Sequence, residues 1–141
     1  MADNFIYSVG LNNVGSYQVS GIPFATGNLS VPGSGSTPLK IEFPFVTQWI
    51  SVSNVGNHHV RRGFSETGVS NGSRNYILIH EDNHPTFNMY NLKLTELYLL
   101  SDNGVGVTNF SVVAGLTNIP VERVNNISPS GSNWSGSIGV G

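Results

Sequence analysis

The grouping of the apolar residues is the feature that most constrains the fold of this chain. Short runs rich in Val, Ile, Phe and Tyr recur along the sequence, and clusters of Gly, Pro, Asn and Ser separate them. The spacing of apolar residues that marks one face of a helix is nearly absent. Short β-prone runs between turn-forming residues are typical of sandwiches and barrels. We therefore expect an all-β fold, an antiparallel, jelly-roll-like β-sandwich of about eight strands.

The expected strands follow from these runs. They are residues 5–9, 16–20, 39–55, 59–66, 75–80, 92–100, 105–115 and 119–124. Residues 26–38 are rich in Gly, Ser and Pro and are expected to form a polar loop. Residues 92–100 contain the helix formers Leu, Lys and Glu, but the segment is short and an Asn-Gly turn signal follows it, so a strand is favoured.

The longest run changes its apolar face midway. Apolar residues occupy alternate positions from Leu39 to Phe45, and the parity then switches at Ile50. A switch of this kind predicts a bulge or bend near residues 46–48. Pro44 has no N–H for a ladder hydrogen bond, which places it on an edge strand or at the bend. Bends of this kind carry a strand from one sheet of a sandwich to the other.

A chain of 141 residues suits one domain, which we assign to residues 1–127. Residues 128–141 are rich in Gly and Ser and are expected to form a C-terminal arm, and the N-terminal stretch "MADNFIY" is expected to form a second arm. The expected core residues are Phe43, Phe45, Trp49, Ile50, Ile77, Ile79, Leu97 and Leu99.

The composition argues against several classes of partner. Charged residues make up 10% of the chain, the net charge is -2, and the six basic residues are dispersed, so no nucleic-acid partner is expected. No apolar run reaches the length of about 18 residues that a membrane span requires, and the N-terminus lacks the pattern of a signal peptide. The chain contains no cysteine, which excludes disulfides and thiolate metal sites.

The stretch "HEDNH" matches the zinc-peptidase pattern H-E-x-x-H at His80, Glu81 and His84. Two histidines at this spacing meet one metal only on a helix. Here strand-prone residues precede His80, and Pro85 disfavours helix at His84. We expect a loop after a strand and assign no metal and no cofactor. Whether the loops with His58, His59, His80 and His84 together bind an ion stays open.

Motifs for nucleophilic catalysis and for nucleotide binding are also missing. The sequence has no G-x-S-x-G, no Walker pattern and no G-x-G-x-x-G between a strand and a helix. We therefore assign no catalytic residue and expect a protein that is not an enzyme. A carbohydrate-binding module stays an alternative, because aromatic and amide side chains recognise sugars. The residues available for it are Trp49, Trp134, Tyr90, Asn88 and Asp102.

Four stretches carry a resemblance in style to a known class of protein. They are "GLNNVGSYQVSG", "KIEFPFVTQWISVSN", "VRRGFSETGVSNGSRNYILI" and "VAGLTNIP". The chain resembles the small virion proteins of tailed bacteriophages, which include capsid decoration or cement proteins and short fibre or knob domains. The resemblance implies a structural protein at the capsid surface of the virion, made in the host cytoplasm, that stabilises the head by binding neighbouring capsid subunits. A fibre or knob domain of the head or tail for host attachment is the alternative.

The expected partners of such a protein are copies of itself, with a trimer favoured, and the major capsid protein or other virion proteins. The adjacent Arg61 and Arg62 are expected to form surface or interfacial ion pairs near Glu42 and Glu66. Trp134 is an isolated indole in the Gly/Ser-rich tail, and we expect it to insert as an anchor into a neighbouring subunit. The expected subunit-interface residues are Phe5, Ile6, Tyr7, Arg61, Arg62 and Trp134.

Overall fold

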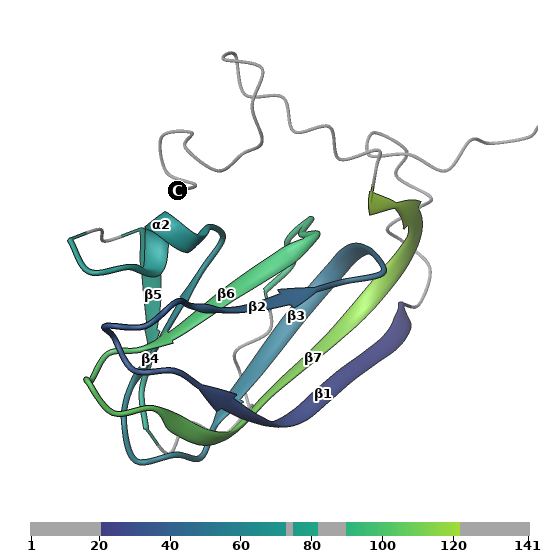
Figure 1. The fold of residues 1–141 in the computed structure, drawn as a ribbon. Helices are drawn as coiled ribbons and strands as arrows, with labels where there is room; N and C mark the ends of the chain where they lie inside the picture. Colours follow the sequence, from purple (N-terminus) through teal and green to yellow (C-terminus); the bar gives the residue numbers. More distant parts are fainter. Residues whose placement is uncertain (1–20, 73–74, 82–89, 122–141) are drawn as a thin grey trace, which may run out of the picture.

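Two antiparallel β-sheets make up most of the described structure (Figure 1). The computed structural model describes residues 21–72, 75–81 and 90–121. Its elements are β1 (Ile22–Val31), β2 (Leu39–Glu42), β3 (Phe45–Asn54), β4 (Val60–Gly63), α2 (Glu66–Val69), β5 (Tyr76–Ile79), β6 (Glu96–Ser101) and β7 (Val107–Pro120). Sheet A has the strand order β1-β7-β3, and sheet B has the order β2-β6-β4-β5. The expectation of a mainly β, antiparallel fold is confirmed.

The long run at residues 39–55 does pass from one sheet to the other. Strand β2 belongs to sheet B and β3 to sheet A, and the chain changes sheet around Pro44. The pairing of β3 with β7 shifts in register on both sides of Thr47. The predicted bend at residues 46–48 is therefore confirmed, and a proline without an N–H is suited to the break between the strands.

The prediction of a polar loop at residues 26–38 is wrong for its first part, because β1 continues to Val31. The backbone of this polar segment pairs with β7, and the register shifts between Thr26 and Leu29. Asn28 within the shift has a φ of 53°, a left-handed conformation that asparagine tolerates better than most residues. The turn-forming residues thus make an irregularity inside an edge strand rather than a loop.

Other boundaries also differ from the expected ones. Strand β6 begins only at Glu96, although the choice of strand over helix for this region is confirmed. Strand β7 continues through to Pro120, so the separate last strand expected at residues 119–124 is partly the end of β7. The segment expected as one strand at 59–66 ends at Gly63, and the one-turn helix α2 follows.

A single hydrophobic core takes residues from both sheets. Its buried members include Ile50, Val52, Phe110, Val112, Ala114 and Leu116 of sheet A and Ile41, Val60, Ile79, Leu97 and Leu99 of sheet B. Of the expected core residues, Phe43, Ile50, Ile79, Leu97 and Leu99 are buried in it.

The expected core positions of Phe45, Trp49 and Ile77 are wrong. Phe45 opens β3 and is 36% exposed, and Ile77 lies in the edge strand β5 and is 41% exposed. Trp49 directly precedes the buried Ile50, so its side chain lies on the opposite face of sheet A, where it is half-buried.

Helix α2 covers part of the outer face of sheet B, above β4 and β6. The Ser65 hydroxyl caps it by accepting a hydrogen bond from the Gly68 N–H at 2.9 Å. Val69 and Leu100 are fully buried on this side. At Gly63 a Cβ would lie 2.6 Å from the Val69 side chain, so glycine permits the close approach of helix and sheet.

The strands expected at residues 5–9 and 16–20, both arms, and the domain boundary at residue 127 lie outside the described residues. Among the residues that the structure does describe, no helix has the length and hydropathy that crossing a membrane requires.

Candidate functional site

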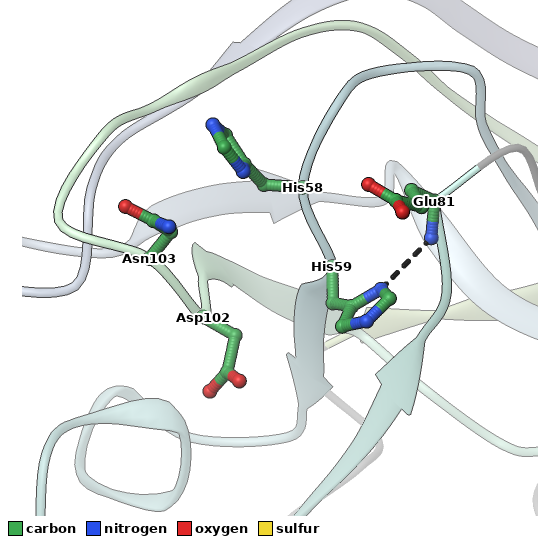
Figure 2. Close-up of a pocket in the computed structure, with 5 residues that line it drawn as sticks. All are labelled: His58, His59, Glu81, Asp102 and Asn103. Carbon is green, nitrogen blue, oxygen red and sulfur yellow. Dashed lines mark hydrogen bonds between the residues drawn. The ribbon is translucent and has the colours of Figure 1, made fainter.

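Three loops meet at one end of sheet B and enclose a pocket of about 230 Å³. Strand β4 is antiparallel to both β5 and β6, and Val60 pairs with Ile79 and with Ser101. The segment that leads into β4 therefore lies beside the segments that leave β5 and β6. Figure 2 shows the lining residues, which are His58, His59, Glu81, Asp102 and Asn103.

His59 links these three loops. Its Nδ1 accepts a hydrogen bond from the Glu81 N–H at 3.0 Å (Figure 2). Its carbonyl oxygen accepts one from the Asp102 N–H at 2.9 Å. Its ring also meets the His80 ring edge to face, with centroids 4.6 Å apart. An accepting Nδ1 assigns the proton of the neutral ring to Nε2.

The open question of a loop-borne ion site receives a partial answer. The loops with His58, His59 and His80 do come together, but the described residues contain no group of three or more His, Asp or Glu side chains that could hold a metal ion. His80 and Glu81 follow β5 directly and are not helical, as predicted for this segment. His84 lies outside the described residues.

Asp102, one of the two acidic residues of the pocket, is already paired. Asp102 Oδ1 lies 2.7 Å from Arg61 Nε, and Arg61 Nη1 donates hydrogen bonds to the Val69 carbonyl at 3.0 Å and to Asn71 Oδ1 at 2.9 Å. The guanidinium also lies 5.0 Å from the centroid of the Tyr76 ring. Arg61 therefore joins the end of α2 to the turn after β6. Its partner is Asp102, not Glu42 or Glu66 as expected.

Arg62, the next residue, points to the other side of sheet B. It is 1% exposed, so its expected place in a surface ion pair is wrong. Strand alternation gives the reason, because Arg62 shares the inner face of β4 with the core residue Val60.

Sheet A is free of charged side chains. None of the residues of β1, β3 and β7 is an Asp, Glu, Lys, Arg or His. The strand register places its outward-facing residues in rows. Pro23, Gly115 and Trp49 form one row, and Ala25, Val113 and Ser51 form the next. We call these six residues the Trp49 face.

The Trp49 face is apolar and partly open to solvent. The indole of Trp49 lies across Gly115, where an added Cβ would overlap the ring. Val113 is 41% exposed, and Pro23 and Ala25 are exposed as well. A large apolar side chain on an uncharged sheet face is a feature of protein-binding surfaces.

The other predicted site residues are not brought together. Trp49 contacts Gly115, the Tyr90 ring lies over Arg62, and Asp102 pairs with Arg61, so these three candidates for sugar binding have separate surroundings. The remaining candidates lie outside the described residues; they are Phe5, Ile6, Tyr7, Asn88 and Trp134.

The uncharged sheet is not among the features predicted above, although the sequence contains a signal for it. No charged residue occurs in residues 4–39 or in residues 103–121, the two stretches that supply β1 and β7.

No protein-family model matches this sequence, and the searches of curated proteins and of solved structures likewise gave no match.

Proposed function

We propose that this protein is a non-enzymatic structural component of a tailed-phage virion, a decoration protein that stabilises the head by binding neighbouring capsid subunits. In this proposal the two sheets form a jelly-roll-like sandwich that presents one outer face to a protein partner. The observation that carries the proposal is the Trp49 face, an apolar surface on a sheet without charged side chains.

The low cost of desolvation favours an uncharged face as a contact surface. Charged groups are expensive to remove from water unless they are paired, and the cores of protein interfaces are accordingly depleted in charge and enriched in aromatic residues. Trp49 is half-buried before any partner binds, so it loses little side-chain freedom on association. The surrounding small and uncharged residues allow a flat partner to approach closely.

The choice of a virion partner comes from the resemblance in style to phage decoration proteins. Expected partners are further copies of the chain, as a trimer, and the major capsid protein. A fibre or knob domain for host attachment is the second candidate, because exposed loops with Val55 and Val105 at 43% and 62% exposure lie at one end of the sheets.

A matched pair of variants tests the proposal. Val113→Lys places a charge in the Trp49 face, whereas Val105→Lys places the same charge on an exposed loop. Binding to tail-free, DNA-filled heads is measured by co-sedimentation, and self-association by sedimentation velocity. We expect Val113→Lys to weaken binding at least about tenfold, because a buried unpaired charge is costly, and Val105→Lys to bind as the wild type does.

Equal binding of the two variants would show that the Trp49 face is not the contact surface. Adsorption of the isolated wild-type protein to host cells, without binding to heads, would favour the fibre or knob function. Binding to a glycan array would favour a carbohydrate-binding module if a change of one exposed aromatic residue abolishes that binding.

A further inference from the structure

Arg62 carries a positive charge into the interior between the sheets. It pairs with Leu99 of β6 and with Ile77 of β5 in the register of sheet B, and its side chain is 1% exposed. The adjacent Arg61 points to the opposite face, where Asp102 neutralises it. The two arginines of one strand therefore occupy opposite environments.

Among the described residues, no hydrogen bond to the guanidinium of Arg62 is found. Its Nε, Nη1 and Nη2 atoms are all buried, and none has an acceptor in this part of the chain. The ion pairs found among the described residues involve Lys40 and Arg61, not Arg62. Burial lowers the pKa of the Arg62 guanidinium from its ordinary value, yet arginine keeps its proton in proteins, so the charge remains.

Tyr90 stabilises the charge of Arg62 only in part. Arg62 Cζ lies 4.1 Å from the centroid of the Tyr90 ring, a cation–π contact. Such a contact offsets part of the charge, but an aromatic ring is not an oxygen acceptor for the five N–H donors of a guanidinium. Buried N–H groups of a cation without acceptors are strongly unfavourable, and an anion at their edge would remove that cost.

The charge lies close to solvent despite its burial. Tyr90 is partly exposed, and it joins β3 through an isolated bridge to Ile50, whose two hydrogen bonds are each 2.9 Å long. Ile77, which faces Arg62 across the β4–β5 pair, is 41% exposed in an edge strand. The buried guanidinium thus has two partly exposed neighbours, Tyr90 and Ile77.

We propose that Arg62 binds a small oxyanion, either a carboxylate or a phosphate, through the paired N–H groups of its guanidinium. The planar fork of arginine N–H donors matches the two oxygens of either anion, and hydrogen bonds of this kind are charge-assisted. Tyr90 contacts the guanidinium through its ring, and the anion supplies the oxygen acceptors that the N–H groups lack among the described residues. This site is independent of the Trp49 face and of the function proposed for it.

The test compares thermal unfolding in sodium acetate, sodium phosphate and sodium chloride at constant ionic strength. We expect acetate or phosphate to raise the Tm of the wild-type protein by about 5–10 °C when the anion exceeds its Kd a hundredfold. The anion that acts at the lower concentration identifies the ligand as carboxylate or phosphate. Arg62→Met should remove the effect, while Arg61→Met, the matched control on the same strand, should keep it.

A measurement on the wild-type chain complements the variants. In an NMR titration with the same anions, the Nε–H resonance of Arg62 should shift and saturate, while that of Arg61 should stay in place. A wild-type Tm equal in all three salts, an equal anion effect in Arg62→Met, or an unmoved Arg62 Nε–H resonance would overturn the proposal.

Discussion

Gly115 determines where the largest side chain of sheet A lies. It belongs to the central strand β7 and pairs with Trp49 of β3, and the indole occupies the space above its backbone. Gly21 also approaches this point, because a Cβ there would lie 2.7 Å from the Gly115 Cα. The absence of a side chain at position 115 therefore lets Trp49 lie flat against the sheet rather than project from it.

Gly115→Ala should destabilise the protein and displace Trp49. The added methyl group overlaps the indole, and overpacking of this kind costs about 1–3 kcal/mol. Urea unfolding measures the free energy, and intrinsic fluorescence reports the environment of the indole. Gly35→Ala is the control, because a Cβ at Gly35 meets no atom within 4 Å. Equal stabilities of the two variants would contradict the packing argument.

Lys40 and Tyr98 pair across β2 and β6 and share the carboxylate of Glu96. Lys40 Nζ lies 2.9 Å from Glu42 and 3.1 Å from Glu96, and the Tyr98 hydroxyl donates to Glu96 at 3.2 Å. Hydrogen bonds to the two glutamates raise the pKa of Lys40. Burial, followed by the charge of Glu96, raises the pKa of Tyr98. Both groups thus hold their protons more tightly in the folded state.

The stability of the protein should fall at alkaline pH. A group with a raised pKa in the folded state stabilises the fold below its unfolded pKa, and this contribution is lost as the pH rises through the folded value. For Tyr98 and Lys40 the loss begins at about pH 10, near their pKa in the unfolded chain. Urea unfolding between pH 8 and 11 measures it, and Tyr98→Phe should lessen the slope. An unchanged slope in Tyr98→Phe would refute this role of Tyr98.

At the scale of elements, Thr47 of strand β3 forms the hydrogen bonds that hold the segment before β6, at Leu92 and Leu94, against this strand. Its N–H donates to the Leu94 carbonyl at 3.0 Å, and its hydroxyl accepts from the Leu94 N–H at 2.9 Å and donates to the Leu92 carbonyl at 2.6 Å. Thr47 is fully buried and lies between the two register shifts of β3. In this irregular part of β3, the Thr47 hydroxyl thus provides hydrogen bonds to the Leu92 carbonyl and the Leu94 N–H, in place of strand pairing.

Thr47→Val should destabilise the protein by about 1–3 kcal/mol, because an isosteric methyl group leaves the buried Leu94 N–H unpaired. Denaturant unfolding gives the free energy, and amide hydrogen exchange at Leu94 should accelerate. The matched control is Thr108→Val in β7, where the side chain is exposed and little change is expected. Unaltered exchange at Leu94 in Thr47→Val would show that the hydroxyl does not hold this segment.

The sequence predicts those elements whose signals are local. The parity switch and Pro44 together predict the passage from sheet B to sheet A, because both act on neighbouring residues. Strand β1 is not predictable in the same way. Residues 26–31 have the composition of a loop, and their backbone is paired only because β7 brings Phe110 next to Leu29. Long-range pairing overrides local propensity here.

The candidate site also depends partly on local sequence signals and partly on long-range strand pairing. The loop after β5 is predicted from Pro85 and the residues before His80, but its contact with His59 depends on the pairing of β4 with β5. The outward position of Trp49 is not predictable from the sequence, because one-residue shifts in β3 change which side chains face inward. The burial of Arg62 has no local signal, since charged residues in short strands usually face solvent.

At the scale of the whole molecule, charge divides the two sheets. The charged residues of the described strands all belong to sheet B, at Lys40, Glu42, Arg61, Arg62 and Glu96. Sheet A has none. The two sheets share one core, so the outer faces present different chemistry to their surroundings. The proposed function assigns association to sheet A and leaves sheet B to solvent.

The topology also predicts slow folding. Strand β7 is central in sheet A, and its partners β1 and β3 both come much earlier in the chain (Figure 1). Sheet A therefore closes only after long loops have formed, and β-rich folds dominated by such contacts fold in milliseconds to seconds. Trp49 reports this step, because its indole reaches Gly115 only when β3 and β7 have paired.

Stopped-flow refolding of a Trp134→Phe variant measures that closure. The chain has two tryptophans, so the variant leaves Trp49 as the sole indole. We expect its fluorescence to change in a phase slower than about 1 ms, with far-UV circular dichroism following the same rate. Gly115→Ala should speed unfolding, since the strained contact is then present in the native state. A complete fluorescence change within the first millisecond would mean that Trp49 finds its place before the distant strands of sheet A meet.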